Sequence, residues 1–334
     1  MNVNIAVVNS KSFGRYTNAV EELKKLGRVE FIEVPKDING KELAKVLNGF
    51  QFVIASVTPY YSAEFFDLNN DVLMIVRHGI GVDNIDLRAA ERHGVVVARV
   101  PGYVEREAVA EHTVALMISA LRMVPQSYIA VKEGRWGDRA KFIGRELPNL
   151  TVGVIGFGNI GSRVAEILAK GFNSKIVVYD PYVSKEAVEA LGYRYVSDLK
   201  ELFKVSDIVT LHAALTKENY HMVNKDVLFN AKEGIIIVNT ARGELIDEQA
   251  LCEALDKGIV SAVAMDVVEG EPISAEHRLL KYGNVIITPH IAAYTWEALK
   301  GMDMAMVYAI KNFIDGKPID GVVVLPKNLR RRSF

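Results

Sequence analysis

Short apolar runs alternate with amphipathic, helix-like segments along most of this 334-residue chain. Runs of this kind predict buried β-strands, and their alternation with helices predicts parallel sheets joined by helical crossovers. The runs fall into two series, so we expect two doubly wound α/β domains. The first series is NIAVVNS, VEFIEV, FVIAS, LMIVRHG and GVVVARV, and the second is TVGVIGFG, KIVVYD, SDIVTLHA, GIIIVNT, SAVAMDVV and NVIITPH.

Segments outside these runs complete the predicted organisation. A long helical pattern covers residues 105–124, and a polar stretch with a few aromatic residues follows at residues 132–149. The last predicted helix, residues 296–316, comes after the second sheet is complete, so we expect it to cross back and pack on the first domain. The terminal LRRRSF is expected to be a frayed, solvated end.

Composition narrows the class of partner. The 40 Lys and Arg residues nearly balance the 41 Asp and Glu residues, so no broad positive field is available for nucleic acid or an anionic membrane. A small-molecule partner is therefore expected. The single cysteine, Cys252, excludes an internal disulfide framework and is read as a small residue of an amphipathic helix. With no signal peptide or membrane-spanning run apparent, a cytoplasmic location is expected.

A glycine-rich turn between a strand and a helix predicts a dinucleotide site. Gly156, Gly158 and Gly161 have G-x-G-x-x-G spacing, with Asn159 and Ile160 between the last two, directly after TVGVI. Asp180 ends the next strand, where a carboxylate accepts hydrogen bonds from ribose hydroxyls and repels a 2′-phosphate. The expected cofactor is NAD rather than NADP. The alternative is an ordinary turn followed by an ordinary strand-end aspartate.

Three later strands of the second series end in residues with complementary chemistry. They deliver Arg242, then Asp266 with Glu271, and then His290. Since ligands of doubly wound folds lie outside the carboxyl ends of the strands, these side chains are expected to share one edge. Arg242 can clamp a carboxylate, and His290 can transfer a proton while a hydrogen-bonded Glu271 favours its imidazolium form. Taken singly, a surface ion pair, a solvated loop residue and a helix cap are equally good interpretations.

The sequence resembles the D-isomer-specific 2-hydroxyacid dehydrogenase family from near its N-terminus to the last helix. The segments that carry the resemblance are HGIGVDNIDLRAAERHGVVV, VIGFGNIGSRVAEIL, VNTARGELIDEQAL, MDVVEGEP and NVIITPHIAA. The resemblance implies a flavodoxin-like substrate domain of residues 1–100 and 294–334, a Rossmann NAD-binding domain of residues 101–293, and a cleft between them. It also implies homodimers joined through the NAD domains, which suits the arm around Trp136 and Phe142.

The resemblance further implies roles for individual residues. A catalytic triad falls on Arg242, Glu271 and His290, and the backbone at Ile80 and Gly81 helps to hold the substrate carboxylate. The nicotinamide half of NAD is expected to lie near Thr240, Ala241, Arg242, Asp266 and His290. No metal ion is expected.

The branch of the family, and so the substrate, stays open. VRHGIGVDNIDL is similar to phosphoglycerate dehydrogenases, with Arg77 available for a phosphate, although Ile80 stands where that branch is often polar. HIAAYT, with Tyr294, is similar to the lactate-type branch, and a hydroxypyruvate-type enzyme is also open. The leading hypothesis is an NAD-dependent enzyme that interconverts a D-2-hydroxy acid and its 2-keto acid.

Two other functions are weighed against it. An NAD-sensing, corepressor-like binding protein of the same fold is the main alternative, because such proteins can keep the triad. A relative acting on formate or phosphite is less favoured, since Glu271 stands where formate dehydrogenases carry an amide. The sequence suggests no role for the remaining histidines. Those placed near the cleft are His78, His112 and His212, and those placed in exposed loops or helix ends are His93, His221 and His277.

Overall fold

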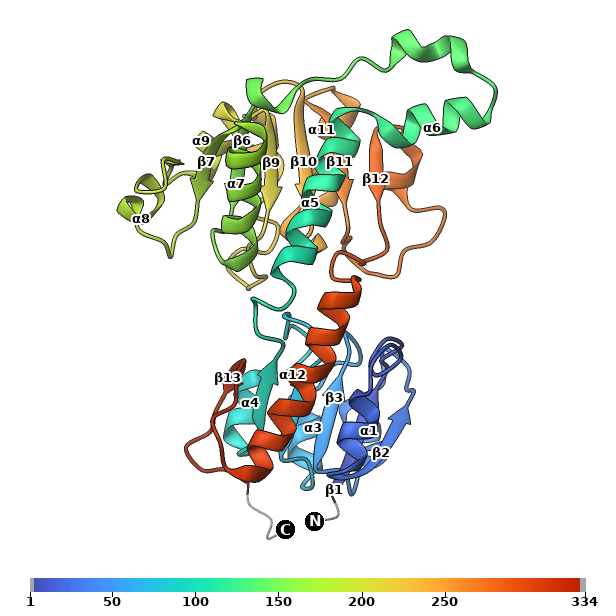
Figure 1. The fold of residues 1–334 in the computed structure, drawn as a ribbon, viewed down its shortest axis with the longest axis vertical. Helices are drawn as coiled ribbons and strands as arrows, with labels where there is room; N and C mark the ends of the chain where they lie inside the picture. Colours follow the sequence, from blue (N-terminus) through green and yellow to red (C-terminus); the bar gives the residue numbers. More distant parts are fainter. Residues whose placement is uncertain (1–2, 331–334) are drawn as a thin grey trace. The chain divides into compact units, whose positions relative to one another are not determined.

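The chain folds into two compact units in a computed structural model that describes residues 3–330 (Figure 1). One unit combines Met1–Glu105 with Ala293–Phe334, and the other is Arg106–Ala292. Compared with the boundaries expected from the sequence, residues 101–105 and residue 293 belong to the first unit rather than to the second.

The first unit is built on a six-stranded sheet with the order β13-β5-β4-β3-β1-β2. The five strands predicted from the sequence pair in parallel. They are β1 (Val3–Val8), β2 (Gly27–Ile32), β3 (Phe52–Ala55), β4 (Met74–Arg77) and β5 (Val96–Arg99). The sixth strand, β13 (Val322–Val324), pairs antiparallel with β5 and was not predicted, so a wholly parallel sheet is wrong at this edge.

Helices cover both faces of the first sheet because its strands alternate their buried side chains between two cores. The helices are α1 (Ala19–Lys24), α2 (Gly40–Val46), α3 (Ala63–Leu68), α4 (Leu87–Arg92) and α12 (Trp296–Asp315). Ile5 and Val7 of β1 join the core under α1 and α12, whereas Ala6 and Val8 join the core under α2, α3 and α4. The last helix, α12, packs on β4 and α1 of this unit.

The end of the chain is partly anchored. Residues 331–334 of the predicted frayed tail lie outside the described part of the chain. Arg330, however, donates from Nη1 to the carbonyl oxygens of Asn69 at 2.7 Å and Val72 at 3.1 Å, and from Nε to that of His93 at 3.1 Å. The prediction of a solvated end is therefore wrong for Arg330, which binds carbonyl groups near the ends of α3 and α4.

The second unit contains a seven-stranded parallel sheet with the order β12-β11-β10-β9-β6-β7-β8. Its strands are β6 (Thr151–Ile155), β7 (Lys175–Tyr179), β8 (Arg194–Tyr195), β9 (Ile208–Leu211), β10 (Ile235–Asn239), β11 (Val260–Met265) and β12 (Val285–Ile287). Only the two-residue β8 was not predicted. The chain runs outward from β6 to β8 and then returns to place β9 on the other side of β6. The carboxyl ends of β6 and β9 therefore flank the point where the strand order reverses, which is where such sheets bind ligands.

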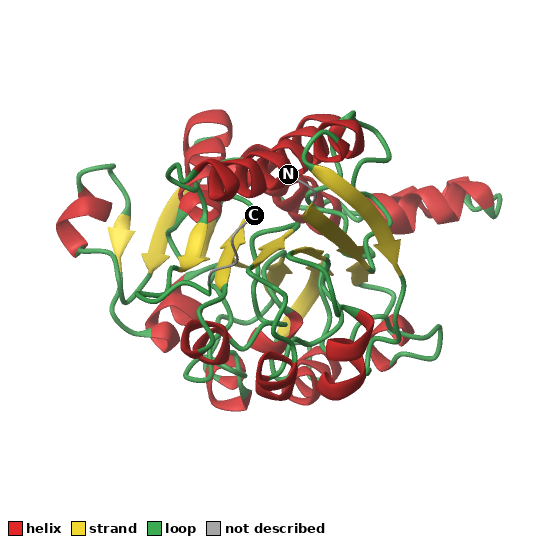
Figure 2. Ribbon diagram, turned by 90° about the horizontal axis from the view of Figure 1, so that it is seen from below, coloured by secondary structure: helices red, strands yellow, loops and turns green. Residues whose placement is uncertain are grey.

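Two layers of helices enclose this second sheet, and Figure 2 shows helices on both sides of the strands. On one face lie α5 (Arg106–Leu121), α7 (Asn159–Phe172) and α8 (Lys185–Glu189); on the other lie α9 (Leu199–Val205), α10 (Lys225–Phe229) and α11 (Glu248–Asp256). Among the described residues no single helix is long and apolar enough to cross a membrane. Only α5 and α6 (Val124–Lys132), bent by 61°, reach those criteria together.

The remaining helices are short and connect or extend these elements. The predicted helix over residues 105–124 ends earlier, because Met123 has a left-handed φ of 51° between α5 and α6. In Figure 1 the segment from α6 through η1 (Trp136–Lys141) extends away from the sheet of its own unit. The other 3₁₀ helices are η2 (Leu147–Asn149), η3 (Gly243–Leu245) and η4 (Arg278–Lys281).

Candidate active site

The predicted nucleotide loop joins β6 to α7, and the geometry requires glycine at two of its positions, Gly156 and Gly161. Gly156 has a φ of 85°, and a Cβ there would lie 2.6 Å from the backbone nitrogen of Ala213. A Cβ on Gly161 would lie 2.0 Å from the carbonyl oxygen of Gly156, so only glycine lets α7 approach the loop. Gly158 is the N-cap of α7 without a side-chain cap, and a Cβ there would meet nothing within 4 Å. Open space at an uncapped helix N-terminus fits the pyrophosphate of a dinucleotide.

Asp180 follows β7 beside this loop. Its side chain is buried, and its two carboxylate oxygens accept hydrogen bonds from the backbone N–H groups of Phe157 and Tyr182, each at 2.7 Å. Each carboxylate oxygen keeps a second lone pair, so a ribose hydroxyl can still be accepted. The arrangement ties the end of β7 to the nucleotide loop and keeps a fixed negative charge there, which fits NAD.

His212 packs against the same loop. Its backbone follows β9, and a Cβ on Gly161 would lie 3.3 Å from the Cβ of His212. The Nε2 atom of His212 lies 2.9 Å from the hydroxyl of Thr210, and burial lowers the pKa of His212. A neutral imidazole in this position is a packing element of the loop and is not suited to proton transfer.

The turn carrying Arg242 is shaped by Asn239, a fully buried residue that the sequence did not single out. The Oδ1 atom of Asn239 accepts from the backbone N–H of Ala241 at 3.0 Å, and its Nδ2 donates to the carbonyl oxygen of Arg242 at 2.8 Å. The guanidinium of Arg242 donates from Nη1 to the carbonyl oxygen of Ala241 at 2.6 Å. The end of β10 thus presents the cation of Arg242 on a turn closed by side-chain hydrogen bonds.

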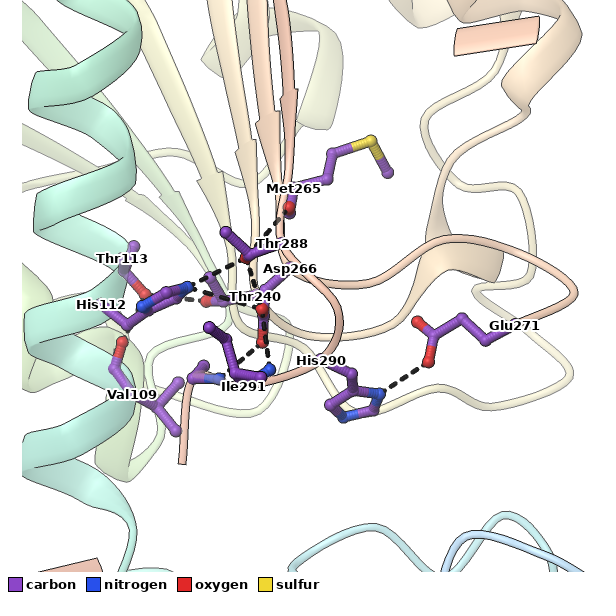
Figure 3. Close-up of polar contacts among 11 residues, drawn as sticks. Val109, His112, Thr113, Thr240, Met265, Asp266, Glu271, Thr288, His290 and Ile291 are labelled. Carbon is purple, nitrogen blue, oxygen red and sulfur yellow. Dashed lines mark hydrogen bonds and ion pairs between the residues drawn. The ribbon is translucent and has the colours of Figure 1, made fainter. Parts of the chain in front are cut away.

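Glu271 and His290 form the hydrogen-bonded pair that the sequence predicts. Their Oε2 and Nδ1 atoms are 2.8 Å apart, and Figure 3 shows the two side chains pointing toward one another from the loops after β11 and β12. The other oxygen of Glu271 accepts from the backbone N–H of Val268 at 2.8 Å, so the carboxylate is fixed from both sides. The side chains of His290 and Glu271 are 39% and 35% exposed. The pair is therefore held in place and still reached by water.

Asp266 holds the chain on both sides of His290, through the Thr288 side chain before it and through the backbone after it. Its side chain is 1% exposed, and it accepts from Thr288 Oγ1, from the N–H of Ile291 at 2.9 Å and from the N–H of Ala292 at 2.7 Å (Figure 3). Burial raises the pKa of Asp266, but the hydrogen bonds from His112, Thr288 and these backbone groups outweigh it and lower the pKa below its usual value. Asp266 is therefore a charged anchor, and the left-handed φ of 55° at His290 is fixed by it.

Two residues of α5 complete this network, and the sequence suggested no role for either. The Nε2 atom of His112 lies 3.1 Å from the hydroxyl of Thr288, and the hydroxyl of Thr113 lies 2.8 Å from that of Thr240. Thr113 in turn donates to the carbonyl oxygen of Val109 at 2.7 Å. The only signal for these contacts in the sequence is the segment EHTV, residues 111–114. There the polar residues His112 and Thr113 interrupt a long helix that is otherwise largely apolar.

Ile80 and Gly81 belong to the first unit, in the loop after β4. Arg99 donates from Nη1 to the carbonyl oxygen of Ile80 at 3.1 Å, and Gly79 has a φ of 143°. Arg77 is 5% exposed and donates from Nη1 to the carbonyl oxygen of His78, so the expectation that it is available for a phosphate is wrong. Within residues 3–330 no group of three or more His, Cys, Asp or Glu side chains is arranged to hold a metal ion.

Known proteins resemble this chain over nearly all of its length. The family model of the "D-isomer specific 2-hydroxyacid dehydrogenase, NAD binding domain" matches residues 114–292. The chain is 40% identical to the D-3-phosphoglycerate dehydrogenase of Archaeoglobus fulgidus over 308 residues, which are 92% of this chain but 57% of that protein. The chain thus spans little more than half the length of the first curated relative that it matches.

A shorter relative and a solved structure match along most of both chains. The hydroxypyruvate reductase of Thermotoga maritima is 39% identical over 284 residues, which are 84% of this chain and 90% of the reductase. The D-lactate dehydrogenase of Aquifex aeolicus, solved with NAD and lactic acid, has a TM-score of 0.85 and 30% identity and covers 97% of this chain and 100% of its own. The chain therefore belongs to the D-isomer-specific 2-hydroxyacid dehydrogenase family, and NAD is its cofactor.

Proposed function

We propose that this protein is an NAD-dependent dehydrogenase that interconverts a D-2-hydroxy acid and its 2-keto acid. The observation that carries the proposal is the pair of Glu271 and His290, because the contact of Nδ1 with the carboxylate leaves Nε2 as the ring atom available to a substrate. Arg242, on the neighbouring strand end, supplies the cation that a small carboxylate anion needs.

The residues of the nucleotide loop would hold the adenosine and pyrophosphate parts of NAD, and those at the ends of β10, β11 and β12 would hold the nicotinamide part. When bound, NAD supplies or accepts the hydride. The first group is Gly156, Gly158, Asn159, Ile160, Gly161 and Asp180, and the second is Thr240, Ala241, Arg242, Asp266 and His290. Asp180 supports a preference for NAD, since its fixed negative charge would repel a 2′-phosphate.

His290 would move the proton. Reduction of a keto acid places a hydride on the carbonyl carbon and a proton on its oxygen, so the imidazolium form of His290 gives its Nε2 proton. In the reverse direction the neutral imidazole takes the hydroxyl proton. Glu271, acting on Nδ1, fixes the tautomer and ring orientation that both directions need. Arg242 would bind the substrate carboxylate and polarise the carbonyl, and the backbone at Ile80 and Gly81 is a separate candidate for binding a carboxylate.

The expected oligomer is a homodimer joined through the NAD-binding units. The arm formed by α6, η1 and the following residues exposes apolar side chains, with Tyr128 at 63%, Trp136 at 71% and Ile143 at 81% exposure. Apolar groups collected on an extended arm are typical of a surface covered by another subunit. Light scattering of the purified chain should give twice the monomer mass.

The proposed activity is tested by oxidation of NADH with a panel of 2-keto acids. The panel should contain pyruvate, glyoxylate, hydroxypyruvate and 3-phosphohydroxypyruvate, so that each type of relative is represented. Turnover of at least one of them, with little activity from NADPH, supports the proposal. Tight binding of NADH without turnover of any keto acid would contradict it and would favour the NAD-sensing, corepressor-like binding protein.

A further inference from the structure

A second imidazole–carboxylate pair lies on the loop that carries Glu271. Glu269 precedes Glu271 by two residues, and its Oε2 atom lies 2.9 Å from Nε2 of His221. Its other oxygen, Oε1, accepts from the hydroxyl of Tyr220 at 2.8 Å. The rings of Tyr220 and His221 are stacked with centroids 3.9 Å apart, so both donors reach Glu269 as one unit. Nothing in the proposed mechanism uses this pair.

The segment that supplies these donors is fixed to the chain directly after Arg242. The backbone N–H of His221 donates to the carbonyl oxygen of Glu244 at 2.9 Å, and that of Val223 donates to the carbonyl oxygen of Leu245 at 3.0 Å. The backbone N–H of Asp247 donates to the carbonyl oxygen of Val223 at 3.0 Å. Tyr220 and His221 are therefore positioned by the same stretch of backbone that follows the Arg242 turn.

The Arg242 turn also touches the Glu269 backbone without an intervening side chain. A Cβ on Gly243 would lie 2.1 Å from the backbone nitrogen of Glu269 and 2.2 Å from the carbonyl carbon of Val268. Such an approach is possible only because Gly243 has no side chain. From Val268 the loop closes onto Glu271 through the hydrogen bond from its N–H to Oε1 at 2.8 Å. One continuous set of contacts thus connects Arg242, Glu269, Glu271 and His290.

The charge of Glu269 suits an anchoring role. Burial raises the pKa of Glu269, but the hydrogen bonds from His221 and Tyr220 outweigh it and lower the pKa below its usual value, although the nearby Asp247 opposes them. An ionised carboxylate makes stronger hydrogen bonds to both donors than a neutral amide would make.

We propose that Glu269, held by Tyr220 and His221, is a positioning residue that fixes the Glu271 loop against the Arg242 turn. It keeps the carboxylate clamp and the proton-transfer pair in a constant relative geometry. This inference rests on the proposed function, since it assigns Glu269 an effect that passes through Glu271 and His290. The competing interpretation is a half-exposed ion pair that contributes only to stability.

A double-mutant cycle separates the two interpretations. Glu269→Gln keeps the side-chain shape and should lower kcat about tenfold while the KM for NADH changes little, because the catalytic groups are displaced and the nucleotide loop is not. In a Glu271→Gln background the same change should lower kcat less than about twofold, since the group through which it acts is already impaired. Equal losses in both backgrounds would overturn the proposal.

His221 offers a rescue test and the first unit offers a matched control. His221→Gln keeps an N–H donor for Glu269 and should retain most of the activity, whereas His221→Leu should match the loss of Glu269→Gln. Asp67→Asn breaks another exposed pair, in which Oδ1 of Asp67 lies 2.8 Å from Nε2 of His93, and should leave kcat unchanged. Equal activity of the two His221 variants would contradict the proposal.

A measurement without turnover keeps this inference distinct from the proposed function. The pH titration of the His290 ring can be followed by NMR in the protein without ligands, with the signal assigned through His290→Asn. Glu269→Gln should move the midpoint in the same direction as Glu271→Gln and by a smaller amount. An unmoved midpoint overturns the positioning role even in an active enzyme. Absence of keto-acid turnover in the wild type, with the midpoint shifted, would instead refute the proposed function alone.

Discussion

Two imidazole–carboxylate pairs of nearly equal length occupy opposite environments in this protein. The nitrogen–oxygen distance is 2.8 Å for His290 and Glu271 and 2.9 Å for His78 and Asp303. The first pair is more than one third exposed, whereas the side chains of the second are 3% and 1% exposed. Distance alone therefore does not distinguish a pair that can exchange protons from one that holds the fold together.

Both members of the buried pair make further contacts with the first unit. Besides His78, Asp303 accepts from the backbone N–H of Gly14 at 3.0 Å and from the hydroxyl of Thr17, and the ring of Phe13 packs edge-on against His78. Asp303 thus joins α12 to β4 and to the loop after β1. In the exposed pair, by contrast, the second ring nitrogen has no hydrogen-bond partner within the described part of the chain. What marks a candidate for proton transfer is this accessible atom, together with a carboxylate that fixes the opposite one.

The largest expected effect is on turnover when His290 is replaced. Asparagine tolerates the left-handed backbone at this position, so His290→Asn should fold normally, with the free energy of unfolding changed by less than about 1 kcal/mol. Because asparagine cannot transfer a proton, kcat should fall by about a hundredfold or more. Steady-state kinetics with the best keto acid and urea unfolding measure the two quantities. Retained turnover would show that the accessible ring nitrogen is not the proton donor.

The buried pair should show the reverse pattern. In Asp303→Asn an amide N–H₂ group, which is a donor, replaces one of the two accepting carboxylate oxygens. It then faces either His78 or the N–H of Gly14 and the hydroxyl of Thr17. Leaving a buried donor unsatisfied should lower the free energy of unfolding by about 2–3 kcal/mol. Asp315→Asn, on the same helix but in a half-exposed bridge to Lys317, is the matched control and should change it little. Urea unfolding compares them. Equal stability of the two variants would refute the structural role of Asp303.

The third effect is a displacement of the pH profile. Glu271→Gln keeps the shape of the side chain but removes the charge that favours the imidazolium form of His290. Keto-acid reduction requires that form and should decline at lower pH than in the wild type, and hydroxy-acid oxidation should correspondingly rise at lower pH. A displacement of one pH unit corresponds to about 1.4 kcal/mol, or tenfold in rate on the declining limb. Coincident profiles of kcat/KM would exclude this coupling. Asp303→Asn should leave the profile in place.

The comparison also shows what the sequence could predict. The apolar runs predicted the inner strands of both sheets and also the edge strands β2 and β12, because a strand with one or two buried faces leaves an apolar pattern in the sequence. The sequence did not predict β8, with two residues, or the antiparallel edge strand β13, with three, because such short runs are not distinguished from loops. The strand ends predicted the contact of Glu271 with His290, since parallel strands present those ends on one edge.

The supporting contacts could not be predicted in the same way. Asp303 lies on the amphipathic face of α12 and meets Gly14 and His78 only after more than two hundred intervening residues fold, so no local pattern marks it. His221 lies in a polar loop and was interpreted as an exposed residue, yet it contacts Glu269 across the Arg242 turn. Such partners are chosen by tertiary packing, and one sequence carries no signal for them beyond the residue types.

The smallest effect is expected at a third pair, which tests burial as the cause of these differences. Oδ1 of Asp67 lies 2.8 Å from Nε2 of His93, as close as in the Glu271 pair, but the side chains are 59% and 27% exposed and α3 and α4 are packed without them. Asp67→Asn should therefore change the free energy of unfolding by less than about 1 kcal/mol, and high salt should remove most of that difference. Urea unfolding at low and high ionic strength measures both. If Asp67→Asn were as costly as Asp303→Asn, the contact itself and not its burial would set the stability, and the distinction between the two pairs would have to rest on the free ring nitrogen alone.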